Sequence, residues 1–163
     1  MEFTDPLTGR IARFVREIGL AVRPGVVEDA AFLPGLALQD GGIVIDESRL
    51  LYPGDILHEA GHLAVLPAVV RARTTGRLEA DGGQEMGAIA WSWAAAAHLG
   101  LDPAVVFHAD GYKQGANAVL ENFAQGRFVG VSYLQWLGLT LEPARVGQQA
   151  GPPYPHMLRW LCA

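Results

Sequence analysis

The sequence predicts a helix-rich α+β domain with one small β-sheet. Several segments place apolar residues at helical spacing, whereas only two short runs, residues 36–39 and 43–46, have the character of strands. These runs flank Asp40-Gly41-Gly42, a turn sequence typical of a β-hairpin. Half of the 163 residues are apolar and 18% are charged, so we expect one domain over residues 1–163, with a full core.

The segment before the hairpin predicts one helix and an irregular connector. The helix is expected to begin at Thr8 or Gly9 and to end at Gly19. Its apolar stripe has helical spacing and comprises Ile11, Phe14, Val15 and Ile18. Residues 21–35 contain two proline–glycine pairs, so we expect no regular structure there.

A second helix is expected over about residues 54–66. Pro53 and Pro67 mark its two ends, and Asp55 in its first turn suits the positive end of the helix dipole. Apolar residues recur along it and give it a face that can be buried: Leu57, Ala60, Leu63, Ala64 and Leu66.

The C-terminal half predicts mainly helices. A polar loop, residues 71–83, leads into a strong helix over about 84–99, which Gly100 ends. Asp102 is a typical N-cap because proline follows it. The remaining expectations are helices at about 103–110 and 113–125, either helix or strand at 129–141, and an irregular tail with a short turn at 157–161.

Residues 58–62, with the sequence His-Glu-Ala-Gly-His, match the zinc-binding pattern H-E-x-x-H. Residues four apart on a helix differ by only about 40° around its axis, so His58 and His62 project from one face and can chelate one metal ion. Glu59 lies about 100° from His58, beside the metal, where a carboxylate can take a proton from metal-bound water. Two buried core histidines are the simpler alternative reading of the same pattern.

A catalytic zinc ion takes three protein ligands, so a third must come from elsewhere in the chain. Glu85 is the leading candidate because it lies near the start of the helix 84–99. On the same side of that helix are three small residues that would let it approach Gly61 closely: Ala88, Ser92 and Ala96. Other possible ligands are His108, Asp81 and Asp110.

Residues 36–99 resemble a minimal zincin metallopeptidase of the gluzincin type. The resemblance rests on a strand-like run, a helix with His58, Glu59 and His62, and a following helix with Glu85. It implies zinc-dependent hydrolysis of a peptide bond, with zinc held by His58, His62 and Glu85, and with Glu59 as general base. The chain departs from the gluzincin pattern at Ile89, where an acidic residue would orient a ligand histidine.

The metzincin branch is excluded. Its extended motif requires a glycine where this chain has Val65 and a histidine where it has Ala68.

The implied reaction also needs a donor for the oxyanion and a place for the substrate. Chemically suitable donors are Tyr112, His108, Tyr133 and His156. An extended peptide could add to the strand 43–46 if that strand has a free edge. A buried strand without a free edge is the alternative.

A non-catalytic zinc-binding scaffold is the competing function. The chain is short for a peptidase, and an interaction surface could include tryptophans, although these more often fill a core: Trp91, Trp93, Trp136 and Trp160. Glu59 favours the enzyme, because a structural zinc site needs no carboxylate beside its second histidine. A peptide or protein is the expected substrate, and a partner protein or an oligomer is compatible with either function.

Composition argues against two other classes. The net charge is −5 and the basic residues are scattered, which argues against nucleic-acid binding. The longest apolar stretch, residues 88–101, is too short to cross a bilayer. The N-terminus has no features of a secretory signal and Cys162 is the single cysteine, so we expect a cytoplasmic protein.

Overall fold

The computed structural model describes residues 2–111, 115–143 and 151–163, and it confirms the α+β class. A three-stranded mixed sheet has the order β1-β3-β2. Its strands are β1 (Val22–Pro24), β2 (Leu36–Gln39) and β3 (Gly42–Ile45). β3 is the central strand, parallel to β1 and antiparallel to β2, and all four of its residues are buried.

The predicted hairpin is confirmed. β2 and β3 pair from Leu36↔Ile45 to Gln39↔Gly42, which leaves a turn of two residues, Asp40 and Gly41. Both have positive φ, 50° and 74°, as a type I′ turn requires. A side chain at Gly41 would also collide with the backbone of Arg71, so this position needs glycine for two reasons.

The expectation that residues 21–35 are wholly irregular was wrong, because they contain β1. This strand has three residues and ends in a proline, so it has no local pattern that sequence reasoning could detect. It forms because it pairs with β3, whose residues lie twenty-one positions further along the chain. The Arg16 guanidinium donates two hydrogen bonds to the Val22 carbonyl, at 2.8 and 2.6 Å.

Six α-helices and one 3₁₀ turn make up the regular structure in the rest of the described residues. In chain order they are α1 (Pro6–Glu17), α2 (Asp55–Ala64), α3 (Ala68–Arg71), α4 (Gly82–His98), the 3₁₀ turn η1 (Pro103–Val105), α5 (Ala116–Ala124) and α6 (Val131–Trp136). None of the helices in these described ranges is long and apolar enough to cross a membrane.

Local capping explains why two of the predicted helix starts moved. α1 begins before Thr8 because Asp5 accepts from the Thr8 backbone N–H at 2.8 Å. α4 begins before Gln84 because Asp81 and Gln84 form a reciprocal capping box. Asp102 is an N-cap as predicted, yet the helix expected at 103–110 is only the turn η1.

Other expectations for the C-terminal half have mixed outcomes. The helix expected at 113–125 is α5, with residues 113 and 114 outside the described ranges. The undecided stretch 129–141 contains α6, and Thr140 then forms an isolated β-bridge with Met157. The short helix α3 lies close to the start of the expected loop.

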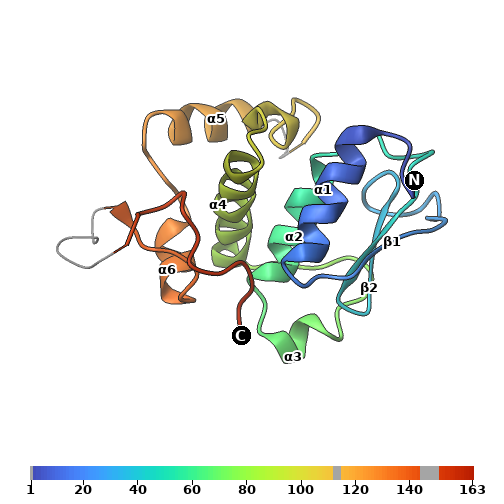
Figure 1. Ribbon diagram of the computed structural model, residues 1–163, viewed down its shortest axis with the longest axis horizontal. Helices are drawn as coiled ribbons and strands as arrows, with labels where there is room; N and C mark the ends of the chain where they lie inside the picture. Colours follow the sequence, from blue (N-terminus) through green and yellow to red (C-terminus); the bar gives the residue numbers. More distant parts are fainter. Residues whose placement is uncertain (1, 112–114, 144–150) are drawn as a thin grey trace.

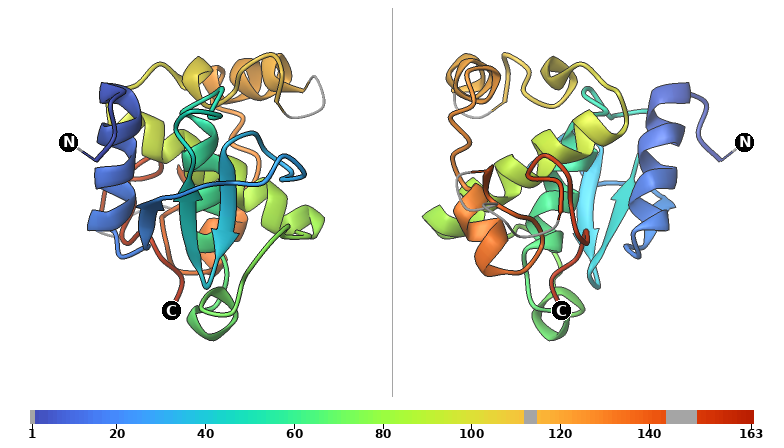
Figure 2. Two further views of the ribbon diagram at one scale, coloured as in Figure 1. Left: turned by 90° about the vertical axis from the view of Figure 1, so that its right-hand side faces the viewer. Right: turned by 60° about the vertical axis from the view of Figure 1, so that its left-hand side comes forward.

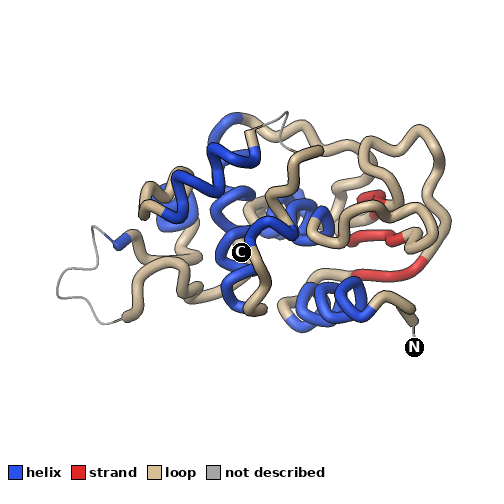
Figure 3. Tube along the Cα trace, turned by 90° about the horizontal axis from the view of Figure 1, so that it is seen from above, coloured by secondary structure: helices blue, strands red, loops and turns tan. Residues whose placement is uncertain are grey.

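α2 is the central helix of the molecule. It contacts α1 and β3 on one side and α4 on the other (Figures 1 and 2). Figure 3 shows the strands gathered at one end, with most of the helical structure beside them. Of the tryptophans, Trp91 on α4 is fully buried, as the core interpretation predicts, whereas Trp136 on α6 is 77% exposed.

α2 and α4 pack closely against each other at Gly61. A Cβ atom at Gly61 would lie 2.8 Å from the Ala88 carbonyl oxygen and 3.1 Å from the Ser92 hydroxyl. Ala88, Ser92 and Ala96 are all fully buried. The predicted close approach through small residues is therefore confirmed.

We expect Gly61→Ala to destabilise the protein. Alanine gains about 1 kcal/mol of helix propensity, but overpacking against backbone costs about 1–3 kcal/mol. The net loss in the free energy of unfolding should be about 1 kcal/mol, measured by urea denaturation. Gly82→Ala is the matched control, because nothing lies within 4 Å of a Cβ atom there. If Gly61→Ala and Gly82→Ala have equal free energies of unfolding, the helices are not in close contact at Gly61.

Candidate metal centre

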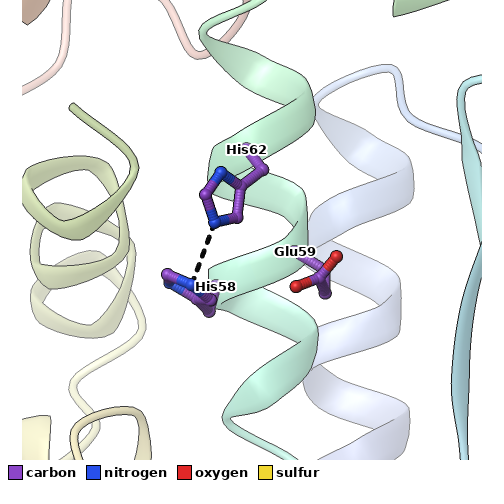
Figure 4. Close-up of side chains that lie close together, drawn as sticks. All are labelled: His58, Glu59 and His62. Atoms are coloured by element: carbon purple, nitrogen blue, oxygen red, sulfur yellow. Dashed lines mark hydrogen bonds between the residues drawn. The ribbon is translucent and has the colours of Figure 1, made fainter. Parts of the chain in front are cut away.

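His58 and His62 project from one face of α2 toward a common point. Their Nε2 atoms lie 3.0 Å apart, and the two rings are nearly perpendicular, at 79°. Figure 4 shows the rings side by side. Their side chains are only 16% and 8% exposed, so the helix holds both nitrogens in a largely buried position.

Glu85 reaches the same point from the first turn of α4. Its two carboxylate oxygens lie 3.1 Å from His62 Nε2 and 3.6 Å from His58 Nε2. Tetrahedral zinc with bonds of about 2.0–2.1 Å separates its ligand atoms by about 3.3 Å, close to these distances. Two imidazoles and a carboxylate are also a donor set that catalytic zinc uses. The spacing of the three side chains is therefore compatible with one bound metal ion.

Glu59 lies beside this group. The ligand atoms of His58, Glu59 and His62 all lie within 4.8 Å of one another, and this group could hold a metal ion. Figure 4 shows Glu59 leaving α2 on a different side from the two rings. The Glu85 oxygens lie close to both ring nitrogens, which favours Glu85 as the predicted third ligand, with Glu59 next to it.

Burial shifts the acid–base properties of the site. Desolvation, and then the neighbouring His62, lower the pKa of His58 to about 3, so its ring is neutral at pH 7 and offers a lone pair to a cation. Desolvation also raises the pKa of Glu59 to about 6, helped by the negative charges of Asp55 and Glu85. A carboxylate with this pKa can both accept and return a proton near neutral pH.

The alternative third ligands are all engaged elsewhere. His108 Nε2 lies 2.7 Å from Asp55 Oδ1. Asp110 accepts a hydrogen bond from the Tyr52 hydroxyl, and Asp81 caps α4 by accepting from the Gln84 backbone at 2.8 Å. Ligation by Glu85 stays a prediction, and these contacts favour it over the alternatives.

The predicted oxyanion donors are spread over the molecule. Tyr112 lies outside the described residues. Tyr133 packs against Gly87, which stands two residues from Glu85 and so faces nearly the opposite way on α4. His156 lines a surface hollow with His98 and Trp160 near the C-terminal end of α4. Among the donors in the described residues, His108 contacts the first residue of α2, Asp55.

The strand expected to receive a peptide has no free edge. Residues 43–46 correspond to β3, which pairs with β1 on one side and β2 on the other. Direct addition of a peptide to this strand is therefore ruled out, and the buried alternative is correct. Sequence could not decide the point because β1 was not recognisable.

Position 89, where the gluzincin pattern has an acidic residue that orients a ligand histidine, is occupied by Ile89 in this chain. Ile89 is part of the apolar core, and among the described residues the buried His62 Nδ1 has no hydrogen-bond partner. Sequence reasoning also missed the Asp55–His108 pair. Asp55 precedes His58 by three residues and so shares its helix face, which was an available signal. His108 was considered only as a metal ligand or an oxyanion donor, and no motif linked it to Asp55.

Comparison with known proteins finds no relative: no family model, no curated protein and no solved structure matches this chain. The candidate metal centre therefore rests on the geometry of its own residues.

We expect the purified protein to bind about one equivalent of a divalent metal, and His58→Ala to lose it, because two remaining ligands chelate far more weakly than three. Elemental analysis after dialysis against zinc measures the content. His156→Ala removes a histidine remote from α2 and serves as the control. If the wild-type protein contains no metal after dialysis against zinc, the proposed metal site does not exist.

Proposed function

We propose that this protein is a small zinc-dependent peptidase with a zincin-like site. One observation carries the proposal: Glu85 on α4 brings its carboxylate to the paired Nε2 atoms of His58 and His62, while Glu59 stands next to them. This is the arrangement that the gluzincin resemblance implies, and it joins residues from two separate helices.

The donor set favours zinc over a hard cation. Neutral imidazole nitrogens suit zinc, whereas magnesium and calcium prefer oxygen ligands. Three protein ligands, rather than four, are typical of a catalytic centre. The Glu85 side chain is 40% exposed, so the proposed ligand set reaches the surface, where a substrate can approach it. Bound zinc would supply Lewis acidity and lower the pKa of a coordinated water to about 7.

Glu59 is the proposed general base. Its carboxylate lies within 4.8 Å of the ring nitrogens of His58 and His62, whereas the proposed third ligand is the Glu85 carboxylate. A pKa of about 6 lets it hold a proton taken from water and return that proton to the leaving amine. A peptide or protein is the proposed substrate class. The competing function, a zinc-binding scaffold, would have no use for a carboxylate in this position.

Glu59→Gln separates the two functions. The amide keeps the size of the side chain but cannot act as a base, so we expect zinc content to stay unchanged and peptide hydrolysis to fall about 10²–10⁴-fold. Rates are measured on a fluorogenic peptide library with zinc-loaded protein. Glu79→Gln, at an exposed position, is the control. Equal rates for wild type and Glu59→Gln would show that Glu59 is not the base.

A zinc-loaded wild type that cleaves no member of the library would favour the scaffold. Zinc content is recorded for the same samples, so a lost metal is not mistaken for a lost base.

A further inference from the structure

A second buried polar cluster lies at the start of the metal-binding helix. His108 Nε2 and Asp55 Oδ1 lie 2.7 Å apart, and both side chains are nearly buried, at 12% and 11% exposed. Tyr52 stacks on the His108 ring, with centroids 3.7 Å apart and planes inclined by only 13°. The Tyr52 hydroxyl donates to Asp110. Hereafter these four residues are called the clamp.

The clamp fastens the segment after η1 to the first turn of α2. At the same place, a Cβ atom at Gly54 would lie 1.9 Å from the Val105 carbonyl oxygen, so the two backbones are in direct contact. This contact and the polar pair together hold residues 105–110 against residues 52–55. The expected helix at 103–110 gives way to this packing.

Stability alone is a poor reason for such a pair. Burial raises the pKa of Asp55, because loss of hydration destabilises the charged carboxylate. The hydrogen bond with His108 lowers this pKa again, but only in part. Buried ion pairs can often be replaced by apolar residues of similar volume without loss of stability. A directional bond at this place therefore calls for a second explanation.

Asp55 shares a helix face with the metal-binding residues. It precedes His58 by three residues and His62 by seven, so the three side chains project from nearly the same side of α2. If His108 were removed, the charged Asp55 would be left buried without its partner and would have to turn toward water. The first turn of α2, which carries His58, would shift with it.

We propose that His108 is a positioning residue of the metal centre, which acts through Asp55 to fix the first turn of α2 and with it the His58 ring. This inference depends on the metal site proposed above, but not on peptide cleavage. The geometry supports it: His108 Nε2 and Asp55 Oδ1 are at hydrogen-bonding distance, 2.7 Å, and among the described residues the buried Nδ1 has no hydrogen-bond partner. The Asp55 bond and the Tyr52 stack thus orient the ring.

The test measures metal binding rather than activity, with Co²⁺ as the probe. His108→Leu keeps volume but removes the donor, and we expect it to weaken Co²⁺ affinity about 10-fold to 100-fold, the range found for residues that orient metal ligands. The visible spectrum of bound Co²⁺ should change too, because the position of His58 sets its ligand field. His108→Gln retains a donor and should recover most of the affinity. His98→Ala, remote from the clamp, is the control.

The double variant Asp55→Leu/His108→Leu distinguishes positioning from packing. If the clamp only fills space, this variant should bind Co²⁺ with wild-type affinity and spectrum, and the proposal would be overturned. If the clamp positions His58, the double variant should have the same midpoint of urea unfolding as the wild type but bind Co²⁺ more weakly. Should it fail to fold, the comparison of His108→Leu with His108→Gln decides, and equal affinities for those two would also overturn the proposal.

The outcome is separable from that of the peptidase proposal. If the wild type binds Co²⁺ but cleaves no peptide, the peptidase proposal is contradicted. The role of the clamp can then still be tested by the Co²⁺ affinity of its variants. Conversely, clamp variants with unchanged metal binding overturn this inference alone.

Discussion

The close packing of α4 on α2 is the constraint on which the candidate site depends. In the proposed ligand set neither helix is sufficient, since two imidazoles come from α2 and the carboxylate comes from α4. Glu85 reaches the histidines because Gly61 lets the Ala88 carbonyl and the Ser92 hydroxyl approach the backbone of α2. Larger residues at this crossing would push the two helices apart. The Glu85 carboxylate would then lie too far from the two histidines for all three side chains to bind one metal ion at about 2.0–2.2 Å.

The sheet and the core give this contact its rigidity. α2 rests on the fully buried strand β3 and on α1, so it is enclosed on the side away from α4. The same enclosure has an electrostatic effect, because burial keeps His58 neutral and raises the pKa of Glu59. One packing arrangement thus produces both the ligand geometry and the protonation states that a metal centre needs.

Features of local origin could be predicted from the sequence. The hairpin follows from Asp40-Gly41, α2 follows from its two prolines and its apolar face, and the approach of α4 follows from the small residues around Ser92. Features that depend on distant contacts could not. β1 pairs with β3, and only the turn η1 forms where a helix was predicted, with its last residue, Val105, and the next residue packed on Gly54. The His108–Asp55 bond spans fifty-three residues and has no motif.

The most direct measurement is anomalous X-ray diffraction at the zinc absorption edge from crystals of the zinc-loaded protein. We expect one strong peak bounded by the Nε2 atoms of His58 and His62 and by a Glu85 oxygen, at bond lengths of about 2.0–2.2 Å. A fully loaded crystal without a peak at this position, or with a peak whose ligands leave out Glu85, would contradict this expectation.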